Sequence, residues 1–425
     1  ERPMSGHDFF ARRPGLSPER LRALAERHGT PLWVYDAGIA RERIASLRQF
    51  DVIRFAQKAN SNVHLLRLMR AEGVMVDAVS LGEIERALVA GFSSRGGRSE
   101  LVFTADLLDR ATLARVVAEE IPVNAGSIEM LHQLGRCAPG HRVWLRINPG
   151  FGHGHSQKTN TGGEHSKHGI WHEQLDQALA EVHQHGLKLV GLHMHIGSGV
   201  DYDHLASVCD AMVTAATALP APIEAISAGG GLSIPYRESD PRPDTDHYFS
   251  LWDSARKHLQ DHFDRPISLE IEPGRFLTAE AGLLLAEVRA VKDAGRNHFV
   301  LVDAGFSDLM RPAMYGAHHD ISLLPAPGRD CGPLRQTVVA GPLCESGDVF
   351  TQGEGGTVQR TPLPPAAVGD LLIFHDAGAY GASMSSNYNS RPLLPEVLVD
   401  GDRAQLIRRR QTIAELMALE LDCDA

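Results

Sequence analysis

Between residues 52 and 275 the chain alternates short apolar runs with longer amphipathic segments, joined by polar or glycine-bearing turns. The apolar runs have the length and composition of buried strands, and the segments between them have helical spacing. We predict eight strands, within residues 52–59, 74–80, 101–105, 121–127, 142–150, 187–197, 223–231 and 267–275. This repeat predicts an α/β fold.

The intervening helices carry their own start and stop signals. In residues 81–91, Leu81, Ile84 and Leu88 fall on one helical face and Gly91 follows as a stop, while "SLGE" from Ser80 is typical of a capping box. Strand–helix alternation implies a parallel sheet, and eight units imply a closed (β/α)8 TIM-like barrel. An open doubly wound sheet is the alternative, but no G-x-G-x-x-G follows the first strand.

The pattern changes after residue 275. Residues 298–306, 336–343, 369–381 and 393–401 are short β-like runs separated by Gly, Pro and Asp turns, which predicts a C-terminal all-β domain, a β-sandwich or barrel. Residues 30–36 are an additional strand that we expect to join this domain, and 412–421 predict a closing helix. We therefore expect an N-terminal segment at 1–36, the barrel at 37–275 and the β domain with its helix at 276–425.

Composition narrows the functional classes. The 425 residues are 43% hydrophobic and 22% charged, as in soluble globular proteins, and no apolar run is long enough to span a bilayer. A net charge of −11 argues against nucleic-acid binding. The N-terminal stretch has no apolar core typical of a secretory signal, and the five cysteines contain no C-x-x-C pair. We expect a cytoplasmic protein.

Chemically useful residues gather where the predicted strands end, which is the rim that holds the active site in such barrels. They are Lys58, Asp77, Ser80, Thr104, Asn124, Asn148, His195, Ser198, Gly229–Gly231, Glu272 and Arg275. By position alone, a strand end with its ammonium in solvent is the better explanation of Lys58. Lys188 opens its strand and belongs at the opposite face, so the contrast favours a functional Lys58.

Two of these segments indicate the kind of ligand. Consecutive glycines at Gly229–Gly231 allow backbone N–H groups to approach a phosphate, which commonly binds after strands seven and eight of a barrel. Glu272 lies on the inward face of the last strand and needs a donor or cation, with Arg275 as the simple alternative partner. A lysine amine, a phosphate site, an inward carboxylate and an imidazole together fit pyridoxal 5′-phosphate.

Six motifs carry a family resemblance: "FAQKANS", "HMHIGSG", "GGGLS", "EPGR", "GPLCESGDVF" and "GAYGASMSSNYNSRP". As an ordered set they resemble the barrel-type amino-acid decarboxylases, and among these they are most similar to the diaminopimelate decarboxylases. The resemblance runs from about Thr30 to the final helix. It implies decarboxylation of meso-2,6-diaminopimelate to L-lysine and CO₂, the last step of lysine biosynthesis.

The resemblance also implies roles for single residues. Lys58 is the expected Schiff-base lysine, His195 stacks on the cofactor, and Glu272 faces the pyridine nitrogen. The phosphate is surrounded by Ser198, Gly229, Gly230, Gly231, Arg275 and Tyr380, with Pro273 and Gly274 completing "EPGR" and Asp77 nearby.

Residues of the β domain complete the implied site. Cys344 is the expected proton donor and Glu345 the ligand of the substrate's distal amino group. Family members contribute these two from the neighbouring subunit, which implies a homodimer. Arg275, Arg311, Tyr315 and Tyr380 are expected to bind the substrate, with its distal carboxylate held by the guanidinium groups.

Several alternatives stay open. A D-ornithine- or D-lysine-type decarboxylase, an amino-acid racemase and a cofactor-carrier barrel could share these features. Residues 150–173 form a long loop rich in glycine and histidine, including His153, His155, His165 and His168. We expect a mobile active-site lid there and no metal, because the loop has no H-x-x-x-H spacing typical of a helical site and no cysteine.

Overall fold

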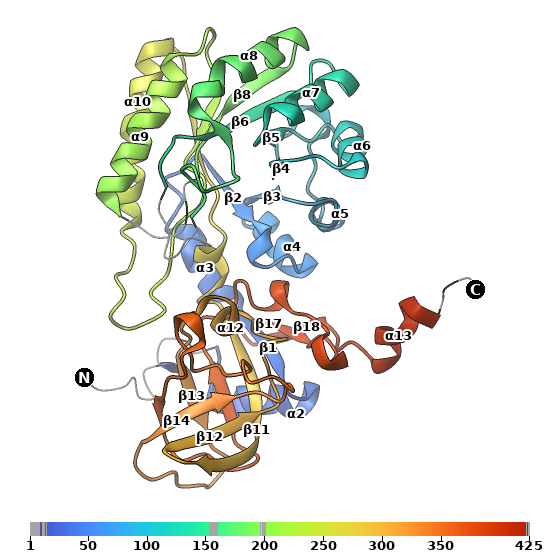
Figure 1. Cartoon of the computed structure of the whole chain (residues 1–425), viewed down its shortest axis with the longest axis vertical. Coiled ribbons are helices and arrows are strands. Elements are labelled where there is room, and N and C mark those ends of the chain that lie inside the picture. Colours follow the sequence, from blue (N-terminus) through green and yellow to red (C-terminus); the bar gives the residue numbers. More distant parts are fainter. Residues whose placement is uncertain are drawn as a thin grey trace. The chain divides into compact units, whose positions relative to one another are not determined.

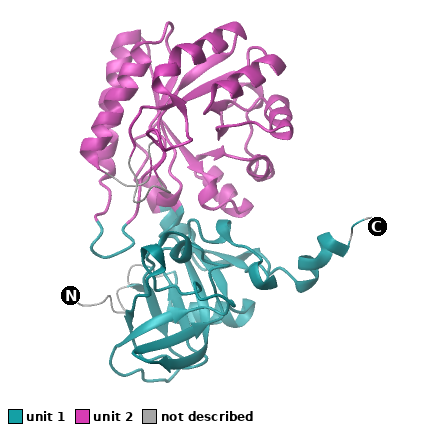
Figure 2. Cartoon of the chain, in the orientation of Figure 1, with its two compact units in different colours: residues 1–41, 235–240, 278–425 teal, residues 42–234, 241–277 magenta. Residues whose placement is uncertain are grey.

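The computed structural model describes residues 9, 10, 13, 15–152, 160–195, 197, 201–421 and 423 (Figure 1). The chain forms two compact units (Figure 2). One, the barrel unit, comprises residues 42–234 and 241–277. The other, the β unit, comprises residues 1–41, 235–240 and 278–425.

The barrel unit contains the predicted closed ring of parallel strands. Its sheet runs β5-β4-β3-β2-β10-β9-β8-β6 and closes through a β5–β6 pairing, with the short β7 (Ile170–Trp171) attached to β6. The ring strands are β2 (Val52–Ala56), β3 (Met75–Ala78), β4 (Leu101–Ala105), β5 (Val123–Ala125), β6 (Arg142–Asn148), β8 (Lys188–His193), β9 (Ala225–Ser227) and β10 (Ser268–Ile271). All eight predicted strands are present, and the (β/α)8 fold is confirmed.

Helices alternate with these strands along the chain. They are α3 (Ala37–Ala45), which crosses the unit boundary, α4 (Val63–Ala71), α5 (Leu81–Ala90), α6 (Arg110–Ala118), α7 (Ile128–Cys137), α8 (Leu175–Gln184), α9 (Tyr202–Thr217) and α10 (Thr245–Phe263). At the start of α5 the Glu83 N–H donates to Ser80 Oγ at 3.2 Å, as the sequence predicts. The Glu83 carboxylate accepts from the Val79 N–H, one residue earlier than in a standard capping box.

The β unit is built on one mixed sheet. Its strands are β1 (Leu32–Asp36), β11 (Gly282–Ala294), β12 (Asn297–Val302), β13 (Ile321–Leu324), β14 (Arg335–Ala340), β15 (Thr361–Leu363), β16 (Leu371–Phe374), β17 (Glu396–Asp400) and β18 (Arg403–Arg408). The N-terminal β1 lies between β11 and β17, antiparallel to the first and parallel to the second. The expectation that an N-terminal strand joins the β domain is confirmed.

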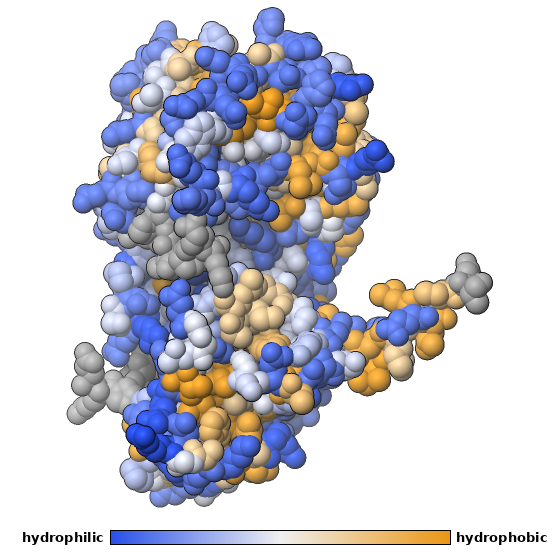
Figure 3. Space-filling view, viewed as in Figure 1, coloured by the Kyte–Doolittle hydropathy of each residue, from blue (hydrophilic) through white to orange (hydrophobic). Residues whose placement is uncertain are grey.

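Alternate residues of these strands form the core of the β unit. Leu32 and Val34 of β1, with partners on β11, β16 and β17, share a buried cluster with Leu21 and Leu24 of α2 (Pro18–His28). The predicted closing helix is α13 (Ile413–Leu421), which buries none of its residues. Figure 3 shows apolar side chains gathered on it, where Ile413, Met417, Leu419 and Leu421 are exposed.

The prediction for the β domain was incomplete. It missed β11, the longest described strand at 13 residues, the shorter strands β13, β15 and β18, and the two short helices α11 (Arg275–Thr278) and α12 (Arg311–Tyr315). None of the described helices is long and apolar enough to cross a membrane.

Candidate active site

Lys58 lies in a single turn of 3₁₀ helix, Gln57–Ala59, directly after β2 rather than within the strand. Its neighbours Gln57 and Ala59 are buried, whereas Lys58 itself is exposed. The turn is anchored because Ala56 N–H donates to the Pro273 carbonyl at 3.1 Å and Gln57 Nε2 donates to the Glu83 carbonyl at 3.1 Å. The buried neighbours therefore hold the lysine backbone at the rim and leave its side chain accessible to a ligand.

Glu272 follows β10 and is buried at the same rim. The imidazole of His193 hydrogen-bonds to its carboxylate through Nε2, and Ser227 Oγ donates to the same oxygen at 3.3 Å. Burial opposes ionisation of Glu272, but the charge and hydrogen bond of His193, aided by Arg54 and Arg146, lower its pKa. The structure thus supplies the partner that a buried carboxylate requires, and Glu272 carries a negative charge.

Asp77, at the end region of β3, behaves in the opposite way. Burial and then the nearby charge of Glu272 raise its pKa well above the usual range, although Thr104 opposes the shift. Thr104 Oγ1 donates to Asp77 Oδ1 at 2.7 Å, and Asn124 Nδ2 donates to Thr104 Oγ1 at 3.4 Å. The two shifts therefore favour a negative charge on Glu272 over one on Asp77.

His195 is held in one neutral form. The Gly230 N–H donates to His195 Nδ1 at 2.8 Å, so the ring proton lies on Nε2, and Thr161 Oγ1 donates to the His195 carbonyl at 2.8 Å. Burial, followed by the charges of Arg146 and Lys58, lowers the pKa of His195 well below its ordinary value. A neutral imidazole with a fixed plane suits stacking against a flat aromatic ring.

The glycines after β9 leave no room for side chains. A Cβ on Gly229 would lie 2.3 Å from the Met194 carbonyl oxygen, and one on Gly230 would lie 2.8 Å from the Glu272 carbonyl oxygen. Gly231 has a φ of 107°, and a Cβ there would lie 2.6 Å from the Gly197 carbonyl oxygen. This close backbone packing requires glycine at all three positions, and the Gly229 N–H donates to Ser227 Oγ at 3.1 Å.

The remaining predicted residues of this unit continue the rim. A Cβ on Gly274 would lie 3.2 Å from the Ala56 carbonyl oxygen, so "EPGR" packs directly on the Lys58 turn. Arg275 begins α11 and is half-buried. Ser198, and His153 and His155 of the predicted lid, lie outside the described residues.

The sequence did not lead us to three residues of the barrel strands that interact with Glu272: His193, Ser227 and Arg146. Arg146 is buried, which lowers its pKa, while Asp106, Glu272 and Asp77 oppose that shift with their charges. The sequence does hold a signal for two of them: Arg146 lies two residues before Asn148 and His193 two before His195, so each pair falls on one face of its predicted strand.

His168, in the predicted lid, interacts with Asp106 in the loop that follows β4. Its Nδ1 lies 2.8 Å from Asp106 Oδ2, and Gly169 N–H donates to Asp106 Oδ1 at 3.0 Å. Burial opposes ionisation of Asp106, but these hydrogen bonds lower its pKa below the ordinary value. The C-terminal end of the long loop is therefore fixed to the barrel.

In the β unit, Cys344 and Glu345 are exposed on the loop after β14. Asp348 organises that loop: its carboxylate accepts from Leu343 N–H at 2.8 Å and from Phe306 N–H at 2.8 Å. Tyr388 Oη donates to Glu345 Oε2 at 2.8 Å. The thiol and the carboxylate are thus presented together on an ordered surface loop.

Arg311 is buried and oriented by two aromatic groups of the β unit. Its Nη1 lies 2.8 Å from His319 Nε2, and its guanidinium carbon lies 4.4 Å from the ring centroid of Tyr236. His319 Nδ1 lies 2.8 Å from the His375 carbonyl oxygen and so donates to it, which leaves Nε2 as the acceptor for Arg311.

Two predicted tyrosines also lie in the β unit. Tyr315 ends α12 and is half-buried. Tyr380 has a φ of 56°, a left-handed conformation that costs a non-glycine residue energy and is enriched at functional sites. It lies between Gly378 and Gly381, which pack tightly on Thr278 and Trp33.

The barrel rim fits pyridoxal 5′-phosphate. It provides an accessible amine, a tight glycine turn after β9, a buried carboxylate that is ionised and a neutral imidazole. Two buried polar atoms at this rim, Asn124 Oδ1 and His193 Nδ1, have no hydrogen-bond partner among the described residues, as expected where a ligand or water completes the network.

Residues 37–279 match the family model for the pyridoxal-binding domain of pyridoxal-dependent decarboxylases. The chain is 67% identical over 413 residues to the diaminopimelate decarboxylase of Streptomyces coelicolor, covering 97% of this chain and 94% of that one. It is 62% identical over 417 residues to the diaminopimelate decarboxylase of Escherichia coli K12, covering 98% and 99%.

The chain also resembles solved structures of diaminopimelate decarboxylases. A crystal structure of diaminopimelate decarboxylase matches with a TM-score of 0.96 and 61% identity, covering 99% of this chain and 100% of that one. The Helicobacter pylori enzyme complexed with L-lysine matches with a TM-score of 0.83 and 28% identity, covering 95% and 99%. The chain therefore belongs to the diaminopimelate decarboxylase family of pyridoxal-dependent decarboxylases.

Proposed function

We propose that the chain decarboxylates meso-2,6-diaminopimelate to L-lysine and CO₂ with pyridoxal 5′-phosphate, the last step of lysine biosynthesis. The observation that carries this proposal is the identity of 62–67%, over nearly the whole chain, to enzymes of that name. The rim geometry supports it independently, because Glu272 is buried, hydrogen-bonded to His193 and ionised at the rim that also carries Lys58 and the glycine turn.

Each rim residue has a defined task in this proposal. Lys58 anchors the cofactor covalently through its amine, and Gly229–Gly231 with Arg275, Tyr380 and Ser198 hold the phosphate. When bound, the cofactor supplies an electron sink for the electron pair left as CO₂ departs. Glu272 holds a negative charge opposite the pyridine nitrogen, and His193 keeps it ionised. His195 stacks as a neutral ring, and the raised pKa of Asp77 keeps a second negative charge at the rim unfavourable.

Substrate choice rests on the second amino-acid head of diaminopimelate. Arg311, with Arg275, Tyr315 and Tyr380, binds its distal carboxylate, and Glu345 binds its distal ammonium. Arg311 is already oriented by His319 and Tyr236, so little side-chain entropy is lost on binding. A monocarboxylate such as D-lysine leaves this guanidinium without its anion. Cys344 donates the proton that completes L-lysine.

We also propose a homodimer in which Cys344 and Glu345 serve the partner's barrel. Both are exposed on an ordered loop, as a residue that acts in another subunit must be. The apolar side chains of α13, exposed in the single chain, are a surface that a second copy would cover. The five cysteines are free thiols, which supports a reducing cytoplasm.

A CO₂-release panel tests the reaction. The substrates are meso-diaminopimelate, its LL isomer, D-lysine, L-lysine and D-ornithine, each with the wild type and Lys58→Ala. We expect release from meso-diaminopimelate alone, and none from Lys58→Ala, which also loses the visible absorbance of the bound cofactor. Lys188→Ala is the matched control, since Lys188 is exposed at the start of β8. Preference for D-ornithine or D-lysine would refute the proposed substrate, and interconversion without CO₂ would indicate a racemase.

Complementation tests the shared site. Lys58→Ala and Cys344→Ala are each inactive or nearly so, but a mixture that exchanges subunits forms heterodimers with one intact site. Random pairing makes half of the dimers mixed, so about a quarter of the wild-type activity returns. No recovery after verified exchange would place Cys344 in the site of its own chain.

A further inference from the structure

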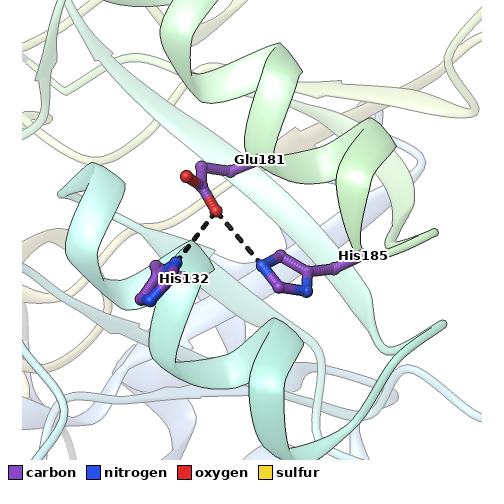
Figure 4. Close-up of side chains that lie close together, drawn as sticks. All are labelled: His132, Glu181 and His185. Atoms are coloured by element: carbon purple, nitrogen blue, oxygen red, sulfur yellow. Dashed lines mark hydrogen bonds and ion pairs between the residues drawn. The ribbon is translucent and has the colours of Figure 1, made fainter.

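A cluster of side chains of the kinds that bind metal ions lies away from the rim (Figure 4). It consists of His132 on α7 and of Glu181 and His185 at the end of α8. Glu181 and His185 are four residues apart and therefore face the same way, toward α7. None of the three is used by the proposed decarboxylation.

The interatomic distances suit a tetrahedral metal ion. Glu181 Oε2 lies 3.3 Å from His132 Nδ1 and 3.2 Å from His185 Nε2. Zinc bonds of about 2.0–2.1 Å to nitrogen and oxygen place the ligand atoms of a tetrahedron roughly 3.3 Å apart. One ligand atom from each residue lies within 4.8 Å of the others, so a single ion can reach all three with small side-chain adjustments.

His185 is the residue that argues most strongly for a ligand. Its Nε2 is buried and points toward the carboxylate, yet it has no hydrogen-bond partner among the described residues, because the contact with Glu181 does not have hydrogen-bond geometry. A buried ring nitrogen without a partner is costly, and a metal ion would satisfy it. His132 leaves the cluster open to water, since 41% of its side chain is exposed.

The backbone holds this geometry in place. A Cβ on Gly135 of α7 would lie 2.3 Å from His185 Cγ, so the missing side chain is what allows the imidazole to lie against the helix. The His132 and His185 ring centroids are 5.7 Å apart, and the rings are nearly perpendicular. Ring positions set by packing reduce the entropy lost when an ion binds.

We propose that His132, Glu181 and His185 bind one Zn²⁺ or a similar first-row divalent cation, which joins α7 to α8. Two imidazoles and one carboxylate favour such a borderline ion over Mg²⁺ or Ca²⁺, and water fills the fourth position. His185 lies three residues before Lys188, where β8 starts, so the site lies at the end of the barrel opposite the rim. Its role is structural, a clamp on neighbouring helices.

Equilibrium dialysis of the cofactor-loaded enzyme against Zn²⁺, with metal analysis, tests the site. The variants are His132→Gln and His185→Gln, and the control is His183→Gln, an exposed histidine two residues earlier on the same helix. We expect one Zn²⁺ per chain that the control retains and both cluster variants lose. At about a hundredfold excess over Kd, Zn²⁺ raises the melting temperature by on the order of 5 °C in wild type and control only.

Two outcomes would overturn the site. Equal Zn²⁺ binding by all four proteins would place the ion elsewhere, and absence of binding at micromolar Zn²⁺ would leave an ordinary polar cluster. His185 packs on Gly135, so His185→Gln could unfold the barrel; His132→Gln, at an exposed position, then decides the question. CO₂ release by folded His132→Gln stays at the wild-type rate, because the cluster does not contact the rim.

Discussion

A buried ion pair below the rim gives a sharp test of how the barrel is held together. Arg54 of β2 donates from Nε and Nη2 to Glu270 of β10, at 3.2 and 3.3 Å, and from Nη1 to the Ser99 carbonyl at 2.9 Å. Only 2% of the Arg54 side chain and 9% of the Glu270 side chain are exposed. The strands that carry them are neighbours in the ring, so the pair joins the first strand of the barrel to the last.

Arg54→Met removes the cation and leaves the Glu270 carboxylate buried without its partner. Removing one member of a buried pair costs about 3–5 kcal/mol, because the remaining charge is uncompensated. Replacing both members, as Arg54→Met with Glu270→Met, removes the uncompensated charge and should leave the stability within roughly 1–2 kcal/mol of wild type. The double variant is therefore more stable than the single one.

Urea unfolding followed by tryptophan fluorescence measures this effect. Three of the four tryptophans, Trp144, Trp171 and Trp252, belong to the barrel unit, so the signal reports mainly on it. With a urea dependence of about 2–3 kcal/mol per molar, Arg54→Met lowers the midpoint by roughly 1–2 M. Arg142→Met is the control, because its pair with Glu224 is solvent-exposed and worth at most about 1 kcal/mol.

Two results would refute this reasoning. If Arg54→Met shifted the midpoint no more than Arg142→Met, water would reach Glu270 and the pair would not be buried in solution. If the double variant were less stable than Arg54→Met alone, the unpaired Glu270 carboxylate would not be the cause of the destabilisation.

Three further predictions concern the rim and the β unit. Gly231→Ala weakens cofactor binding at least tenfold, measured by equilibrium titration, because the added Cβ would collide with the Gly197 carbonyl oxygen. Gly186→Ala is the control: Gly186 also has a positive φ, but open space surrounds it, so cofactor binding stays unchanged. His193→Gln removes the main group that opposes the effect of burial on Glu272, so the pKa of Glu272 rises although Arg54 and Arg146 remain. The acid limb of the kcat–pH profile then moves to higher pH, and an unmoved limb would refute the role of His193. Burial lowers the pKa of His375 from 6.5 to about 3, so between these pH values the folded protein binds fewer protons than the unfolded chain, and its stability falls as the pH drops. His375→Gln should therefore reduce the dependence of the melting temperature on pH between pH 4 and 7. An unchanged pH dependence would contradict this role of His375.

Local signals were sufficient for most of the barrel. Each strand is a short apolar run bounded by turns, and helices such as α5 are capped by Ser80 at the start and by Gly91, in the left-handed conformation, at the end. These features depend on residues close together in the chain, so they can be recognised without tertiary contacts. The same alternation located Lys58, Glu272 and the three glycines at one rim, because parallel strands end on the same side of a barrel.

The β unit was harder to predict from the sequence, because its strands are stabilised by pairing with segments that are distant in the chain. β11 was missed although it is the longest strand: its first half is buried on both faces and its second half is exposed, so its apolar pattern has no single period. Its pairing with β1, almost 250 residues earlier, has no local signature.

Residue types and their spacing along strands specify the barrel, its rim and a chemistry based on an amine, a phosphate cradle and a carboxylate. Which groups are charged is a property of the folded molecule alone. Glu272 and Asp77 are both carboxylates at strand ends, but His193 contacts the first and Thr104 the second, and the pKa of Glu272 is lowered while that of Asp77 is raised. The same holds for His132, Glu181 and His185, which converge only because α7 packs against α8. Electrostatic energies depend on distance and burial, and both are set by tertiary packing.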